Sequence, residues 1–344
     1  MKLQAGTLLY ALAISLVIGM ITTSVLINEQ YNRILIQRDV IREEVTRNAR
    51  SGINYLCAQQ SENGNVEDDI DLYGRGKDSV QLLSRPWGIY DILIANAHTG
   101  DQQFQRIALA GSYPDAEQQY ALWLGDMDRA LKVCGNTELT GKCFLPKAGV
   151  ERAYLEGKSY TGREMVYGSV VPSSRFVPEY SKERFTLLES LLKGELNVED
   201  SLVFWNDLQA NYTVQFSFSG PVCTVNHNSA LIVSGNYLEG QICIRSSVSI
   251  TVSANATLQK IVLIAPKIVV EDDVHGQFQI IARDSVIIGK NVHLSYPSAI
   301  CLCAGKASPL ETGIMINEGT EIDGTLFAVR TEELPQRQLL VDIR

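Results

Sequence analysis

The sequence predicts three parts in order: a long N-terminal α-helix that crosses a membrane and continues as an amphipathic helix, a small α+β segment, and a mainly β solenoid (β-helix). Three observations support this fold class. An uncharged apolar run opens the chain, a helical pattern of apolar residues follows it, and a motif with an 18-residue period recurs in the C-terminal half. The predicted domains are residues 1–58, 59–120 and 121–344.

The opening run from Thr7 to Ile27 contains no charged residue. At about 1.5 Å per residue in a helix, it matches the roughly 30 Å hydrocarbon core of a bilayer. A secretory signal peptide has a shorter apolar region, about 7–15 residues, followed by a small-residue cleavage site, which this run lacks before Asn28. No second run of this length follows, so the sequence predicts a single-pass membrane protein.

The second part of the predicted helix carries apolar side chains on one face. No proline interrupts residues 1–60, and apolar positions recur at steps of three, four or seven residues, as on one side of an α-helix. We predict that this face packs against the helices of partner proteins. Its residues are Ile34, Ile41, Val45, Ala49, Ile53 and Leu56. A coiled-coil stalk or a helix lying on the membrane surface is the alternative interpretation.

The first residues form a short leader with one basic side chain, Lys2, which ends at Gly6 and is followed directly by the apolar run. The helix ends in the segment RNARSGINYLCA, residues 47–58. Together these features resemble the N-terminal region of type IV pilins and type II secretion pseudopilins, in particular the minor subunits that cap the filament. Ala11 stands where major subunits carry a glutamate, and the absence of that glutamate is typical of the tip pseudopilin.

The resemblance implies a protein of the inner membrane whose body lies in the periplasm. Its expected partners are the membrane and the membrane helices of a filament or secretion complex, in a homo- or hetero-oligomer. The resemblance also implies a candidate leader cleavage point between Gly6 and Thr7, and retention from Met1 is the alternative.

The charges beside the apolar run favour the opposite orientation. Lys2 precedes the run, whereas Arg33, Arg38 and Arg42 follow it. By the positive-inside rule this distribution places the body in the cytoplasm. Both orientations therefore stay open at the level of the sequence.

The segment between the helix and the repeats is short and contains turn signals. Residues 59–71 are polar and acidic, and we interpret them as a linker. Residues 89–95 and 104–110 are rich in β-branched and aromatic side chains around the turn HTGD, so we predict a β-hairpin.

The C-terminal half repeats a motif of apolar residues, Ω-x-Ω-x-x-x-Ω-x-Ω. Ile232, Ile250, Ile268 and Val286 stand 18 residues apart, and the motif resumes at Ile314 after an insertion. Fixed periods of about 20 residues with short β-branched pairs are typical of solenoids, in which each turn of chain stacks about 4.8 Å above the last. The sequence therefore predicts a β-helix.

The turns of the motif support the same alignment. Asn255, Asp273 and Asn291 fall at equivalent places, and Asn and Asp tolerate a left-handed backbone and can hydrogen-bond along a stack. A similar pattern in residues 131–141 predicts that the solenoid begins near residue 121, with a helical excursion at 181–195. The spacing also resembles the repeats of bactofilins, which are polymer-forming bacterial β-helices.

The composition limits the partners and the chemistry. The formal net charge of −9 and pI near 5.1 argue against nucleic acid, whose binding depends on clustered Lys and Arg. Seven cysteines are an odd number, so at least one is unpaired within the chain. Cys134 and Cys143 either form a bridge or remain buried thiols.

Few side chains are placed for catalysis or metal binding. His275 and His293 stand one period apart, and we expect a solvated pair on adjacent turns rather than a metal site. Asp272 aligns with Lys290, which predicts a surface ion pair. The local cluster of the kind that β-helical lyases and hydrolases use comprises Asp272, Asp273, Arg283 and Asp284. We predict no catalytic residue, no cofactor and no metal.

The predicted function is that of a non-enzymatic, membrane-anchored assembly protein. It would be a minor pilin-like or pseudopilin-like component of a filament or secretion machine, with the β-helical body as a cap or docking surface. The first alternative is a membrane-tethered, polymerising scaffold similar to bactofilins. The second is a β-helical carbohydrate-active enzyme.

Overall fold

The computed structural model describes residues 5–59, 67–74, 76, 78–111, 119–155, 157–175, 182–194, 201–202, 212–305, 312–330 and 340–343. The chain divides into two compact units, Met1–Ala110 (unit 1) and Gly111–Arg344 (unit 2). The small sheet that the sequence placed in a separate segment belongs to the same unit as the N-terminal helix.

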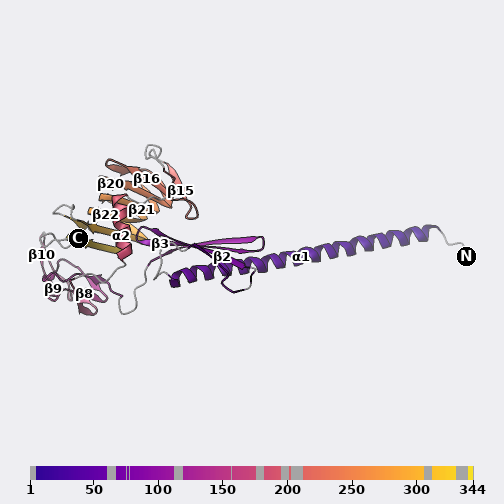
Figure 1. The fold of residues 1–344 in the computed structure, drawn as a ribbon, viewed down its shortest axis with the longest axis horizontal. Helices are drawn as coiled ribbons and strands as arrows, with labels where there is room; N and C mark the ends of the chain where they lie inside the picture. The colour runs from indigo at the N-terminus through magenta and orange to yellow at the C-terminus, as the bar shows by residue number, and fades with distance from the viewer. Residues whose placement is uncertain are drawn as a thin grey trace. The chain divides into compact units, whose positions relative to one another are not determined.

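Helix α1 spans Ala5–Gln59 without a break (Figure 1). Its 55 residues correspond to about 80 Å at the standard helical rise. The segment contains no proline, and Leu, Ala, Arg and Glu, which favour helices, are frequent in it. Every described side chain from Leu8 to Val40 is exposed, and burial begins at Ile41. The prediction of one long helix with an apolar first half is confirmed.

Unit 1 also contains a four-stranded antiparallel sheet in the order β1–β2–β3–β4, as far as its residues are described. Its strands are β1 (Glu67–Ile70), β2 (Asp78–Trp87), β3 (Tyr90–Thr99) and β4 (Gln102–Ala110). The predicted hairpin is confirmed as β3 and β4, and Gly100 adopts the positive φ of 57° that their turn requires. The linker interpretation is wrong for β1, whose acidic residues conceal an edge strand.

The last third of α1 packs on one face of this sheet. Its buried side chains are Val45, Ala49, Ile53 and Leu56, and those of the strands are Val80, Leu82, Leu93, Ala95 and Ala97. Gly52 lies at the closest approach, where a Cβ atom would come within 2.8 Å of Leu82 Cδ2 and 3.0 Å of Ala95 Cβ. A glycine in the helix therefore lets its backbone lie directly against the strands.

In unit 2, the described strands between residues 122 and 172 are short and pair among themselves. They are β5 (Leu122–Trp123), β6 (Leu131–Val133), β7 (Leu139–Thr140), β8 (Cys143–Leu145), β9 (Val150–Arg152), β10 (Tyr154–Leu155), β11 (Lys158–Ser159), β12 (Val166–Tyr167) and β13 (Val170–Pro172). The pairs are parallel except β10 with β11. Leu122 pairs with Cys143 and Cys143 with Val170, so the steps differ from 18 residues. The regular repeat does not begin near residue 121 as predicted.

Helix α2 spans Lys182–Lys193, within the predicted excursion at 181–195. It contacts strands β21 and β22 of the large sheet described below, and its Leu188 is buried. Gly194 ends the helix with a φ of 78°, and its N–H donates to the carbonyl of Ser190 at 2.8 Å. Arg245 Nη2 donates to the carbonyl of Leu192 at 3.3 Å, which fastens the end of the helix to the sheet.

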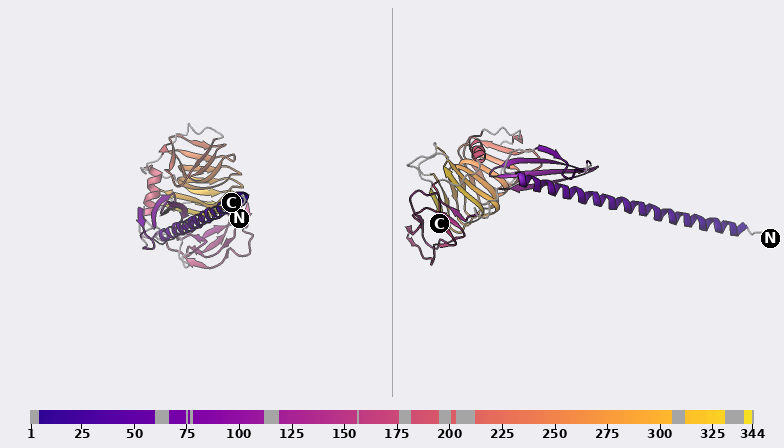
Figure 2. Two further views of the ribbon diagram at one scale, coloured as in Figure 1. Left: turned by 90° about the vertical axis from the view of Figure 1, so that its right-hand side faces the viewer. Right: turned by 60° about the horizontal axis from the view of Figure 1, so that its bottom comes forward.

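The rest of unit 2 forms one sheet of 13 strands within the described residues, and all its pairs are parallel. The strands are β14 (Ser201–Leu202), β15 (Thr213–Phe216), β16 (Cys223–His227), β17 (Leu231–Val233), β18 (Tyr237–Gly240), β19 (Ile242–Ser246), β20 (Ser249–Val252), β21 (Thr257–Val270), β22 (His275–Ile288), β23 (His293–Ala304), β24 (Gly313–Ile316), β25 (Glu321–Arg330) and β26 (Leu340–Ile343). Figure 2 shows the later ones, orange to yellow, stacked side by side. A mostly β body with a large parallel sheet is confirmed.

The register of this sheet follows the predicted period, with one exception. Ile250 pairs with Ile268, and Ile268 with Val286. However, Leu231 rather than Ile232 pairs with Ile250, and Ile232 is 63% exposed. This turn of chain is one residue longer than 18. Because side chains alternate between the two faces of a strand, a one-residue slip turns Ile232 outward.

The inward side chains of the sheet form one continuous apolar core, which extends from Cys223 to Ile316. The long strand β21 passes two irregularities, at Lys260, whose φ is 61°, and at Pro266. Proline cannot donate to a ladder and is tolerated at such bulges. Each bulge bends the strand, so a single strand contributes side chains to the core from three directions.

Candidate functional site

The first half of α1 is an apolar helix with nothing packed on it. An 18-residue window within Leu8–Ala58 has a mean hydropathy of 2.1 and no buried residue. Of the described helices, this one is long and apolar enough to cross a membrane. Arg33 and Glu29, 2.7 Å apart, are the first charged residues after the run and mark its polar end.

Beyond the apolar run, α1 continues to expose large apolar side chains on a stretch that also carries charges. Tyr31, Ile36 and Val40 are 61%, 63% and 59% exposed, although Arg33, Arg38 and Asp39 lie among them. Charged residues are costly in the hydrocarbon core, so this part of the helix lies outside it. Its apolar side chains are uncovered in the single chain.

The predicted partner face is divided between two environments. Val45, Ala49, Ile53 and Leu56 are covered by the chain's own strands β2 to β4, with exposures of 0–7%. These four residues are therefore not available to partner helices, which corrects that part of the prediction. The sequence could not distinguish the two cases, because an amphipathic pattern shows that a face is covered and not by what. Ile34, 48% exposed, and the partly buried Ile41 remain at the end of the face.

Gly6 and Thr7, the candidate cleavage point, lie in the first turns of α1. Their side chains are outside the described residues, as are residues 1–4. Cleavage after Gly6 stays a prediction.

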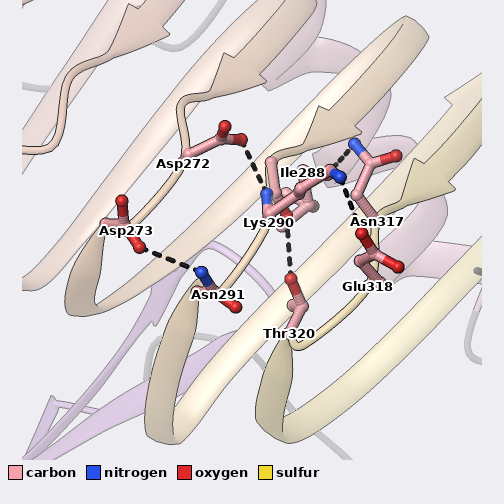
Figure 3. Close-up of polar contacts among 9 residues, drawn as sticks. Asp272, Asp273, Ile288, Lys290, Asn291, Asn317, Glu318 and Thr320 are labelled. Atoms are coloured by element: carbon pink, nitrogen blue, oxygen red, sulfur yellow. Dashed lines mark hydrogen bonds and ion pairs between the residues drawn. The ribbon is translucent and has the colours of Figure 1, made fainter.

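A row of polar turns lines one edge of the large sheet (Figure 3). Asp273 and Asn291 both adopt left-handed backbone conformations, with φ values of 59° and 54°. Asn291 Nδ2 donates to Asp273 Oδ1 at 3.2 Å, which is the hydrogen bond along the stack that the sequence predicted. Gly319 continues the row with a φ of 74°. Asn255 does not share this backbone conformation; its Oδ1 accepts from Ser234 Oγ and from the N–H of Gly235.

The predicted pair of Asp272 and Lys290 takes a different form. Asp272 Oδ1 accepts from the backbone N–H of Lys290 at 2.7 Å, and Lys290 Nζ pairs with Glu318 Oε1 at 2.6 Å on the following turn (Figure 3). The Glu318 carboxylate raises the pKa of Lys290, and Lys290 in turn lowers the pKa of Glu318. Both side chains are more than half exposed, so this pair orders the turns rather than forming a buried site.

The carboxylates of the lyase-like cluster do not converge. Arg283 binds Asp284 through two hydrogen bonds of 2.9 Å, and Asp284 raises the pKa of Arg283. Asp272 and Asp273 are engaged in the turn row instead. A shallow depression beside that row is lined by Val269, Val270, Glu271, Asp272, Ile287, Gly289 and Asn317.

His275 and His293 lie on adjacent strands in register, as predicted. Their ring centroids are 6.0 Å apart, and His293 Nδ1 lies 3.1 Å from Glu321 Oε2 on the next strand. No group of three or more His, Cys, Asp or Glu side chains is arranged to hold a metal ion in the described part of the chain.

Sequence reasoning missed a second polar network on the same side of the sheet. Glu239 accepts hydrogen bonds from Lys260 Nζ, Tyr237 Oη and Gln215 Nε2 at 2.9–3.1 Å. The lysine, and then the tyrosine, lower the pKa of Glu239, and Glu239 raises that of Tyr237. The i, i+2 spacing of Tyr237 and Glu239 in a strand was the available signal, because such residues lie on one face. Lys260 reaches them from a bulge that the sequence did not reveal.

The cysteines, all within the described residues, are thiols and form no disulfide. Cys301 and Cys303 are buried with their Sγ atoms 3.5 Å apart. The neighbouring thiol of Cys303 and burial both raise the pKa of Cys301, so this pair stays protonated and unreactive.

Comparison of the chain with protein-family profiles, curated protein sequences and solved structures finds no match. Its function is therefore argued from the geometry described above.

Proposed function

We propose that this chain is a non-enzymatic, membrane-anchored assembly protein, a minor pilin-like or pseudopilin-like component of a filament or secretion machine. The observation that carries the proposal is the division of labour along α1. Its last third is covered by an antiparallel sheet of the same chain, and everything before Ile41 is uncovered. One rigid helix thus joins a folded head to a long apolar surface.

The membrane covers only part of that surface. A bilayer core of about 30 Å accommodates about 20 helical residues, so it accounts for the uncharged run up to Ile27. The exposed apolar residues beyond it are Tyr31, Ile34, Leu35, Ile36 and Val40. Large apolar patches on a protein surface mark interaction sites. Neighbouring helices of the same assembly are the proposed cover.

Unit 2 is proposed as the cap or docking surface. Its long strands pair in parallel at 18-residue steps around one apolar core, which supports closure into a β-solenoid. In this proposal the body lies in the periplasm and α1 anchors it in the inner membrane.

Substitutions in the uncovered stretch of α1 test the proposal. Ile36→Asp and Val40→Asp should abolish co-purification of partner helices with the full-length chain, while unit 1 stays folded because neither side chain is in its core. Gln37→Asp is the matched control, since it adds the same charge to a polar position between them. Recovery of the same partners with the Ile36 and Val40 variants would contradict assembly through this stretch.

The parallel strands also favour a second candidate, a membrane-tethered scaffold similar to bactofilins that polymerises through the ends of the sheet with its body in the cytoplasm. A reporter fused after Arg344 distinguishes the two. Activity in the periplasm alone would overturn the tethered scaffold, and activity in the cytoplasm alone would overturn the pilin-like proposal.

A further inference from the structure

The strongest arrangement outside the proposed assembly surfaces is a row of three side chains at the start of three neighbouring strands. His275 begins β22, His293 begins β23 and Glu321 begins β25. The strands pair in register, His275 with His293 and His293 with Glu321. Adjacent strands are about 4.8 Å apart, so each side chain has the next as its nearest neighbour.

The separation of the two imidazoles suits a shared metal ion. Their ring centroids are 6.0 Å apart. Two imidazoles bound to one tetrahedral zinc ion at about 2.0–2.1 Å per Zn–N bond have centroids roughly 5 Å apart. His275 is exposed and His293 half-exposed, so small side-chain rotations close the difference at little cost.

Glu321 supplies the second observation. A carboxylate only accepts hydrogen bonds, so the 3.1 Å contact fixes Nδ1 of His293 as the donor. The lone pair of a neutral His293 then lies on Nε2, the nitrogen left for a metal. Metal-binding histidines typically donate their other nitrogen to a carboxylate in this way, which fixes the ring and strengthens the ligand.

We infer that His275 and His293 form a surface site for a divalent transition-metal ion of the zinc or copper type, with Glu321 orienting His293. Imidazole nitrogen favours these ions over calcium and magnesium. Since the described residues offer only two protein nitrogens here, water or a group from another molecule completes the coordination. The inference does not rest on the proposed assembly function. It revises the sequence-based expectation of no metal, because the spacing could not reveal the bond to Glu321.

Zinc titration of the full-length chain in detergent, purified without a histidine tag, tests the site. The exposed Cys57 is replaced by serine so that a surface thiol does not compete. We expect saturable binding of one equivalent by this protein, loss of that binding in His275→Ala and in His293→Ala, and about tenfold weaker binding in Glu321→Gln. His227→Ala is the matched control, since His227 is a histidine of the same sheet that bonds to Ser229.

Electron paramagnetic resonance with Cu²⁺ gives an independent readout. The parent protein should show two nitrogen donors and the His275→Ala variant one. Failure of the parent protein to bind zinc saturably, or binding that survives both histidine substitutions, would overturn the inference. Equal loss in His227→Ala would do the same, because it would show adsorption to scattered histidines.

Discussion

Gly52 of α1 and Leu82 of β2 approach so closely that a Cβ atom on the glycine would lie 2.8 Å from Leu82 Cδ2. Real Cβ atoms do not tolerate such a contact in a packed core without displacement of their neighbours. The pair therefore fixes the distance between the helix and the sheet of unit 1, and with it the rigid connection between the head and the membrane-facing helix.

Gly52→Val should loosen this connection. The added methyl groups meet Leu82, Val80 and Ala95, and overpacking of this kind costs about 1–3 kcal/mol. Hydrogen exchange of the amides in β2 and β3 should become faster. Gly19→Val is the control, because it lies on the same helix with nothing within 4 Å of its Cβ position. Equal protection in the two variants would show that Gly52 does not set the packing distance.

Asn48 is the second test of the helix–sheet packing. Its side chain is 1% exposed, and neither amide atom has a hydrogen-bond partner among the described residues. A buried polar group without a partner is destabilising, so Asn48→Leu, a change of similar size, should raise the free energy of unfolding by about 1 kcal/mol or more. Denaturant unfolding followed by tryptophan fluorescence measures it. A lower midpoint for Asn48→Leu, with Asn48→Asp no worse, would mean that the amide is satisfied in solution.

Gly319 tests the turn row of the large sheet. Its φ is 74°, and a Cβ atom there would lie 2.3 Å from Asn291 Oδ1. Gly319→Ala therefore combines a left-handed backbone, which costs roughly 1–2 kcal/mol, with displacement of the Asn291 side chain from Asp273. We expect a lower melting temperature. Gly305→Ala should have no such effect, since its Cβ position is open.

The ion pair of Lys290 and Glu318 predicts a pH dependence. The pKa of Glu318 is lowered from its ordinary 4.5, so its contribution to stability is present above pH 4.5 and is lost as the pH falls through the lowered value. The pKa of Lys290 is raised from 10.5, so its contribution is present below pH 10.5 and is lost as the pH rises through the raised value.

The melting temperature of Glu318→Gln should accordingly lie below that of the parent chain between these limits and approach it in acid. High salt should shrink the gap, because the pair is exposed. Glu271→Gln, a change of another exposed carboxylate, is the control. A difference independent of pH and salt would assign the effect of Glu318 to packing or to the turn.

Several features of the chain followed from the sequence alone, because each depends on contacts that are close or periodic. The absence of proline and the uncharged run determined the continuous helix α1. The 18-residue spacing of Ile250, Ile268 and Val286 determined the register of the large sheet, since stacked strands of one chain repeat their side chains at the repeat length. The same spacing placed His275 beside His293.

Other features were decided only by the tertiary structure. The pattern of Val45, Ala49 and Ile53 required a covered face, but only the position of strands β2 and β3 showed that the cover is the chain's own sheet. The bond from His293 to Glu321 spans 28 residues across an insertion of irregular length, and one extra residue turned Ile232 outward. Local periodicity specifies which side chains share a face. It does not specify what meets that face, because loop lengths and long-range packing determine where each face is placed.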